Sequence, residues 1–396
     1  MRERVAWMAA VLAAGLAGAG ITWAVMRGPA AEPPLPPGLA ASPAFSRFLT
    51  VYGDIRHEAI WPNTPTSLLD GAIQGMVASL SDPFSVYLTP KAAQALNQEL
   101  DSTLSGIGVA LDETAAGHFV ILQVFPGTPA AHAGLRPDDQ ILAVDGRTVA
   151  GETADAVAAA IRGPAGTAVT LTVSRGGVER TVTVHRATIQ VPTVFPRMLP
   201  GHVGYLAVTE FGYRTGGEVL AAVRQLDQEG ARAYVVDLRN NPGGSLAECL
   251  QAVSAFVPPG PVVRLEYKEA SLDRTYDSTG PGTTRPVAVL VNQDTASAAE
   301  IFAAAVAQRH VGILVGTRTY GKGIVQQLIP LSGGASLKLT VAKYLTPDGS
   351  DIEHRGLVPN LVVPEPKTAV PGVVGQDPQL DRALAWIQGR LDRAGH

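Results

Sequence analysis

Beyond about Val203 the chain alternates short apolar runs with segments long enough for helices, and this alternation limits the fold more than any other feature. The apolar runs YVVDL, VAVLVN and GILVG are separated by SLAECLQAVSAF and SAAEIFAAAVAQR. Strand, helix and strand in this order require crossover connections, which produce a largely parallel sheet. We therefore predict an α/β domain over residues 188–364, followed by a helical tail over 365–396 that contains the amphipathic segment DPQLDRALAWIQGRL.

Three polar loops follow the predicted strands of this domain. RNNPGG (239–244) follows the strand that ends at Leu238, NQDTASAAE follows the strand that ends at Val291, and TRTYGKG follows the strand that ends at Gly316. Ligand sites in parallel α/β sheets form outside the carboxyl ends of the strands, so these loops are expected to meet at one rim of the sheet. That rim is the candidate active site.

The second loop carries a candidate nucleophile, Ser297. It stands where the loop passes into an Ala-rich helix, so its hydroxyl and the N–H of Ala298 share a helix N-terminus, which favours a developing oxyanion. The same residues also match a capping box, with Glu300 three positions after the serine. Taken alone, this segment is better explained as an ordinary helix cap.

The third loop carries a candidate base, Lys322, which opens the apolar run IVQQLIPL between two glycines. Gln326 lies four residues on, on the same face if the run is a strand. A lysine acts as a base near neutral pH only if its pKa falls from about 10.4 to near 7, which desolvation can achieve. A solvated loop lysine is the alternative. In the first loop, Gly243 and Gly244 permit close backbone approach and offer a second oxyanion donor, or form a plain tight turn.

The N-terminal residues indicate the compartment. Val5 to Met26 carries no charged side chain and follows Arg2 and Arg4, so residues 1–27 read as an uncleaved membrane anchor or, alternatively, a cleaved signal peptide. Arginines on the leading flank place the bulk of the protein outside the cytoplasm. Residues 28–43, which include EPPLPPG, are predicted to form a stiff spacer.

Two smaller regions precede the α/β domain. Residues 44–101 have helical apolar spacing, interrupted by SDPFSVYLTP. Residues 102–187 change to short strands, Gly-rich turns and one helix near 153–161, and VTLTVSRGGVERTVTV reads as a hairpin. These patterns predict a helical region followed by a compact β module.

Composition excludes several classes of function. The formal net charge is -4 and the basic residues are scattered, so nucleic acid is not an expected partner. The single cysteine, Cys249, is expected to be an inert packed thiol, and the eight histidines show no metal-ligand spacing. We therefore predict no metal and no cofactor.

Four motifs together carry a family resemblance: SDPFSVYL, DLRNNPGG, TASAAEI and YGKGIVQ. In this order and at this spacing they resemble the C-terminal processing peptidases, or tail-specific proteases, of peptidase family S41. The resemblance implies a multidomain α/β and α+β protein with an N-terminal helical region, an inserted PDZ domain and a ClpP/crotonase-like serine protease core. It also implies site roles: Ser297 as nucleophile, Lys322 as base, Gln326 as the residue that orients the lysine, and the amides of Gly243 and Ala298 as oxyanion hole.

The module at 102–187 resembles the PDZ domain of that family, through GIGV and GTPAAHAGLRPDDQILAVDG. PDZ domains bind C-terminal peptides by strand addition and capture the carboxylate with loop amides. The resemblance implies protein substrates with exposed apolar C-termini and a possible homo-oligomer. The alternative for GIGV is a Gly-rich turn that starts an ordinary strand. The capture loop would consist of Gly106, Ile107, Gly108 and Val109.

Three positions depart from the family pattern, and three other functions compete with proteolysis by a serine and a lysine. Ala299 stands where Ser is usual, which weakens the motif match but not the chemistry. Asp138 and Asn360 stand where Gly and Asp are usual, and we expect these two changes to be structural. Residues 316–322 match a phosphate loop, but a glycine follows where Ser or Thr would hold magnesium, and a strand follows where that motif needs a helix. A Ser-His-Asp site lacks both the G-x-S-x-G elbow and a histidine on the three loops. An inactive, membrane-tethered PDZ adaptor is the remaining alternative.

Overall fold

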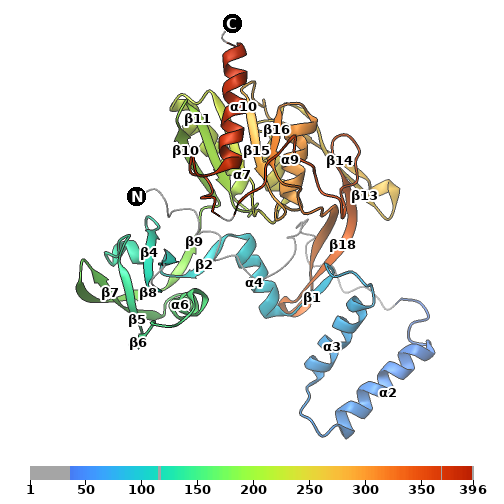
Figure 1. Cartoon of the computed structure of the whole chain (residues 1–396). Helices are drawn as coiled ribbons and strands as arrows, with labels where there is room; N and C mark the ends of the chain where they lie inside the picture. Colours follow the sequence, from blue (N-terminus) through green and yellow to red (C-terminus); the bar gives the residue numbers. More distant parts are fainter. Residues whose placement is uncertain (1–35, 115–116, 367, 395–396) are drawn as a thin grey trace.

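The computed structural model describes residues 36–114, 117–366 and 368–394, and divides into a helical N-terminal region, a small β module and a larger α/β domain (Figure 1). The predicted membrane segment at 1–27 lies outside the described residues. Within the described ranges, none of the helices combines the length and the apolar character needed to cross a bilayer.

The α/β domain contains the predicted parallel sheet. Its neighbouring strands run parallel except for the antiparallel pair at one edge, β10 and β11. At the far edge the Asn360 side chain accepts a hydrogen bond from the Leu314 amide (2.8 Å), so the departure at this position is structural. The strand order is β10 (Val194–Leu199), β11 (Val203–Val208), β12 (Ala233–Asp237), β15 (Val287–Val291), β16 (Gly312–Gly316) and β19 (Leu361–Val362).

Helices cover both faces of this sheet, so successive strand residues enter different cores. Val236 packs with α7 (Thr215–Gln228), α8 (Leu246–Val253) and α9 (Ala298–Gln308), whereas its neighbour Val235 packs against α10 (Pro378–Ala394). Alternation on a sheet buried on both faces explains the continuous apolar runs in the sequence. The predicted amphipathic tail helix is thus a third layer of the α/β domain (Figure 1).

A buried ion pair fixes this third layer to the first polar loop. Arg239, directly after β12, is bound by Asp237 (2.6 Å) and by Asp377 (2.7 Å), and Asp377 also accepts from the first amides of α10. The Tyr205 hydroxyl donates to Asp237 (2.6 Å). A guanidinium held between two carboxylates in a fork geometry orients the loop that begins at residue 239.

An antiparallel sheet adjoins the parallel one, and the sequence patterns indicated only one of its strands, IVQQLIPL. The strand β1 reaches this sheet from the N-terminal region, between α3 (Pro65–Ala78) and α4 (Pro90–Leu100), while α2 (Pro43–Glu58) lies further out (Figure 1). The sheet consists of β1 (Val86–Leu88), β18 (Ser336–Leu345), β13 (Gly260–Tyr267) and β14 (Arg274–Ser278), with β17 (Ile324–Pro330) also paired to β18.

The β module is joined to the rest of the chain by a two-stranded link. Strands β2 (Thr103–Gly106) and β9 (Ala187–Gln190) pair with each other where the chain enters and leaves the module. The predicted hairpin is present, with Arg175 opposite Val178, and the helix predicted near 153–161 is also present. Asp138 has φ 68°, which explains why glycine is usual there. The module contains β3 (Val109–Glu113), β4 (Phe119–Val124), β5 (Gln140–Val144), β7 (Ala168–Arg175), β8 (Val178–His185) and α6 (Ala154–Ile161).

Candidate active site

The loops that follow β12, β15 and β16 meet at one rim, as the parallel order of these strands predicts. Backbone hydrogen bonds join them in pairs: the Ala296 amide donates to the Asn241 carbonyl, and the Tyr320 amide donates to the Thr295 carbonyl, both at 3.0 Å. After Lys322 the chain continues as strand β17, which excludes the helix that a phosphate loop requires. Among the described side chains, no group of three or more His, Cys, Asp or Glu residues is arranged to hold a metal ion.

Ser297 has a backbone conformation that an ordinary helix cap does not adopt. Its φ and ψ are 56° and -120°. Capping residues of other helices here, such as Thr64 (-121°, 156°) and Ser245 (-69°, 127°), are extended, as capping requires. A non-glycine residue in such a region costs about 1–3 kcal/mol, and such strain clusters at functional sites. The conformation therefore favours the nucleophile over the helix cap, because nucleophilic serines stand on sharp, strained turns.

The Glu300 carboxylate holds the serine loop and the lysine loop together. It is fully buried, and one oxygen, Oε2, accepts from the amides of both Ser297 and Lys322 at 2.9 Å. The other oxygen accepts from the Thr319 hydroxyl (2.5 Å) and from the Gly321 amide (2.8 Å). Burial raises the pKa of the Glu300 carboxyl, and these four donors act in the opposite direction. The backbones at positions 297 and 322 are thus within two hydrogen-bond lengths of each other.

Further contacts fix the carbonyl side of the serine and the glycines of the lysine loop. The Tyr344 hydroxyl donates to the Ser297 carbonyl (3.2 Å). The Gly323 amide donates to Glu353, and a Cβ at Gly321 would come within 2.7 Å of a backbone nitrogen. Sequence analysis recognised Glu300 only as half of a capping box and did not identify Tyr344. A carboxylate in an otherwise apolar, Ala-rich helix was the available signal for Glu300.

Lys322 is buried in surroundings that favour its neutral form. Its residue is 1% exposed, and its Nζ lies 4.6 Å from the centroid of the Phe84 ring. Burial lowers the pKa of Lys322 to about 7, and the charge of Lys338 acts in the same direction. That change corresponds to about 5 kcal/mol in favour of the amine, more than the about 2 kcal/mol that a desolvated cation–π contact offers the ammonium. Carboxylates with smaller, opposing effects are Glu353, Asp82 and Glu300.

Gln326 has one satisfied and one unsatisfied end. The side chain is fully buried, and its Nε2 donates to the Thr340 hydroxyl (3.2 Å). Its Oε1 has no hydrogen-bond partner among the described residues. Because buried acceptors are rarely left unpaired, this oxygen indicates a functional position four residues after the lysine.

The two candidate oxyanion-hole amides differ in whether they already donate a hydrogen bond. Gly243 has φ 102°, and a Cβ on it would come within 2.8 Å of the Ser297 Cβ, so only glycine fits there. Its amide donates to the Asn241 side chain (2.9 Å) in this structure. The Ala298 amide makes no hydrogen bond within the described chain. The structure therefore places both residues beside Ser297 and leaves one of their two amides available.

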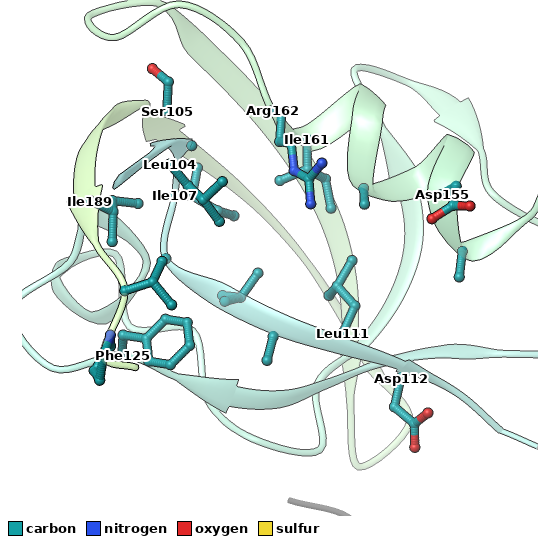
Figure 2. A pocket seen from close by; sticks show the side chains of 18 of the residues that line it. Leu104, Ser105, Ile107, Leu111, Asp112, Phe125, Asp155, Ile161, Arg162 and Ile189 are labelled. Carbon is teal, nitrogen blue, oxygen red and sulfur yellow. The ribbon is translucent and has the colours of Figure 1, made fainter. Parts of the chain in front are cut away.

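The β module contains an apolar groove of about 440 Å³ between strand β3 and helix α6 (Figure 2). Ile107, Leu111 and Phe125 line it, and the predicted capture loop 106–109 forms one end. Gly108 has φ 87°, and a Cβ on it would collide with Thr128, so the loop depends on glycine. Since β3 is an edge strand of its sheet, its outer edge offers the backbone groups that strand addition requires. The groove extends to Phe195 and Thr209 of the α/β domain.

These features define a class: a protease whose α/β domain carries polar loops at one rim and is joined to a PDZ module. Family models match Peptidase family S41 at residues 202–363, a PDZ domain at 120–175 and the Activating protease CtpB N-terminal domain at 42–92. The chain belongs to peptidase family S41, among the carboxy-terminal processing proteases.

Two relatives illustrate the membership. The carboxy-terminal processing protease CtpA of Bacillus subtilis is 36% identical over 319 residues, which covers 80% of this chain and 68% of the relative. The carboxyl-terminal-processing protease of Synechocystis sp. is 36% identical over 326 residues, 80% of this chain and 76% of the relative.

Solved structures show the same architecture. The photosystem II D1 C-terminal processing protease is 28% identical with a TM-score of 0.50, over 86% of this chain and 90% of that one. A putative S41 protease from Bacteroides fragilis shares the fold, at 20% identity and a TM-score of 0.56, over 92% of this chain and 99% of that one.

The role of Glu300 is testable by replacing it with Gln. Whichever way the new amide faces, its NH₂ group points at two donors, so the free energy of unfolding should fall by about 3 kcal/mol or more. Glu248→Gln is the control, because Glu248 accepts from the Gly216 amide at 3.0 Å and keeps an oxygen for it. Urea denaturation measures both variants. A Glu300→Gln protein as stable as the wild type would contradict the role given to the carboxylate.

Proposed function

We propose that the protein is a serine endopeptidase that cleaves other proteins near their C-termini, with Ser297 as nucleophile, Lys322 as base and the PDZ groove as the site for the substrate tail. One observation carries this proposal: a single oxygen of Glu300 accepts hydrogen bonds from the backbones of a strained serine and a buried lysine. Family membership supports proteolysis, and the geometry supports these two residues as the pair that performs it.

The proposed reaction begins with the neutral Lys322 amine. It takes the proton from the Ser297 hydroxyl as the oxygen attacks the scissile carbonyl carbon, and the resulting ammonium gives the proton to the leaving amine. Water then hydrolyses the acyl-enzyme by the same steps. The free Ala298 amide binds the oxyanion, and the Gly243 amide joins it after leaving the Asn241 side chain. The unpaired Oε1 of Gln326 accepts from the ammonium and orients it.

A lysine base is favoured over a histidine base by the neighbouring residues. His354 follows the segment that packs on the lysine loop, and its amide donates to the Gly321 carbonyl (2.8 Å). The His354 side chain is nevertheless 86% exposed, so it lies on the surface and not in the buried site of Lys322. The inactive PDZ adaptor is disfavoured for the same reason that the protease is favoured: a buried lysine and a strained serine are costly features without a catalytic role.

Placement at a membrane and self-association are parts of the proposal with separate support. The uncharged segment Val5 to Met26, with arginines before it, supports an anchored protein whose catalytic part lies outside the cytoplasm, or a secreted one if the segment is removed. Exposed apolar side chains on the N-terminal helices and on the connection between them support a homo-oligomer; they include Phe48, Leu49, Val51, Ile55, Ile60, Trp61 and Met76.

Substitution of each member of the pair tests the chemistry. Ser297→Ala and Lys322→Ala should each lower the rate of cleavage of an unstructured protein with an apolar C-terminus by at least about a thousandfold. Ser254→Ala changes a half-buried serine at the C-terminal end of α8 and should leave the rate unchanged. Cleavage that survives both changes overturns the pair. An adaptor would bind the tail in all variants and cleave in none, the wild type included.

The pH dependence of cleavage tests the state of the base. Only the neutral amine accepts the serine proton, so kcat/KM should rise with pH through an apparent pKa near 7 and fall about tenfold per pH unit below it. Lys322→Arg should be inactive over the whole range, because a guanidinium stays protonated. A rate that continues to rise up to the pKa of free lysine would count against a desolvated base.

Tail recognition is testable in the groove. Ala158→Glu introduces a carboxylate into the apolar lining, opposite an incoming terminal carboxylate, and should weaken binding of a fluorescent peptide with an apolar C-terminus by at least about tenfold. Ala159→Glu makes the same change on the exposed side of α6 and should not alter the affinity. Equal affinities of the two variants, measured by fluorescence anisotropy, would contradict the assignment of the groove.

A further inference from the structure

The aromatic ring over Lys322 comes from outside the α/β domain. Phe84 belongs to the segment SDPFS, which leaves helix α3 and leads into strand β1. Strand β1 pairs with β18, with Val86 opposite Lys338, so the segment is delivered to the rim of the catalytic domain as part of its antiparallel sheet (Figure 1). The ring centroid then lies 4.6 Å from the Lys322 Nζ.

A chain of hydrogen bonds fixes this segment to the lysine strand. Asp82 accepts from the Phe84 amide (3.0 Å) and from the Ser85 hydroxyl (2.5 Å). The Ser85 oxygen accepts from the Thr340 amide (3.0 Å), and the Thr340 hydroxyl accepts from Gln326 (3.2 Å). The position of Phe84 is therefore set by the same network that holds the glutamine proposed to orient the lysine.

The charged groups around Lys322 do not by themselves keep it neutral. The positive charge of Lys338 on β18 disfavours the ammonium form of Lys322. Three carboxylates from three other segments favour that form: Glu353, Asp82 and Glu300. With charges of both signs nearby, exclusion of water decides the state of the amine. The Phe84 ring contacts the reacting end of the side chain and is the apolar cover on that side.

We propose that Phe84 is a positioning residue that holds the Lys322 side chain in place and out of water, which makes the N-terminal region part of the catalytic site. This inference rests on the proposed function, because it concerns the base of that mechanism. It predicts that a smaller side chain at position 84 admits water to Lys322 and raises the pKa of the amine toward that of free lysine. The activity should then shift to higher pH and not be lost.

The test is the pH profile of kcat/KM for a graded series at position 84, on the full chain and an unstructured protein with an apolar C-terminus. Phe84→Ala should raise the apparent pKa by at least about one pH unit and lower the rate at pH 7 at least about fivefold, and its rate should recover to within about threefold of the wild type near pH 9.5. Phe84→Leu keeps an apolar cover and should keep the wild-type profile. Phe84→Val should fall between them, and it decides the question if thermal melting shows that the alanine variant does not fold.

Tyr87→Phe is the matched control. It removes the hydrogen bond from Tyr87, three residues after Phe84 in β1, to Asp70 on α3 (2.7 Å) and should leave the profile unchanged. A wild-type profile for Phe84→Ala overturns the proposal, and so does a loss of activity that no pH restores, which indicates a merely structural residue. Failure of the proposed function gives a different result. If Lys322 is not the base, Lys322→Arg keeps the activity and the pH profile of the wild type, or the wild type itself does not cleave.

Discussion

The active site depends on one buried carboxylate. Glu300 stands in the first turn of an apolar helix and is surrounded by donors that all come from the two loops it joins: three amides and the Thr319 hydroxyl. A buried carboxylate is stable only if its oxygens accept hydrogen bonds. Most other arrangements of the two loops would remove donors from Glu300 or expose it to solvent, so few arrangements are compatible with the fold. The strained backbone of Ser297 persists because this carboxylate and the Tyr344 hydroxyl hold its two sides.

The parallel sheet, its rim of loops, the hairpin and the last helix were predictable because each follows from local spacing. Apolar runs, glycines and helix-length segments report what a stretch of chain does by itself. The antiparallel sheet was largely missed, since β1 acquires its role only from β18. The same holds within the site. Loop order predicted that Ser297 and Lys322 meet, whereas the tie through Glu300 and the ring of Phe84 are long-range contacts that no local pattern contains.

The link between the PDZ module and the α/β domain is narrow but specific. The paired strands β2 and β9 carry the chain in and out, and the Ser102 hydroxyl donates to Glu210 (2.7 Å) next to the polar loops. Phe195 of the α/β domain is among the residues that line the apolar groove. A ligand that fills the groove would therefore contact both sides of the link, and its binding energy would depend on how the two parts are oriented.

The pairing of β1 with β18 also bears on how the protein is made. The Thr340 amide and the Ser85 hydroxyl that it contacts are 255 residues apart, with the whole PDZ module between them. Synthesis from the N-terminus produces strand β1 first, then the PDZ module, and strand β18 only after both. Until that strand emerges, β1 has no partner, so this part of the fold is completed only when most of the chain has been synthesised.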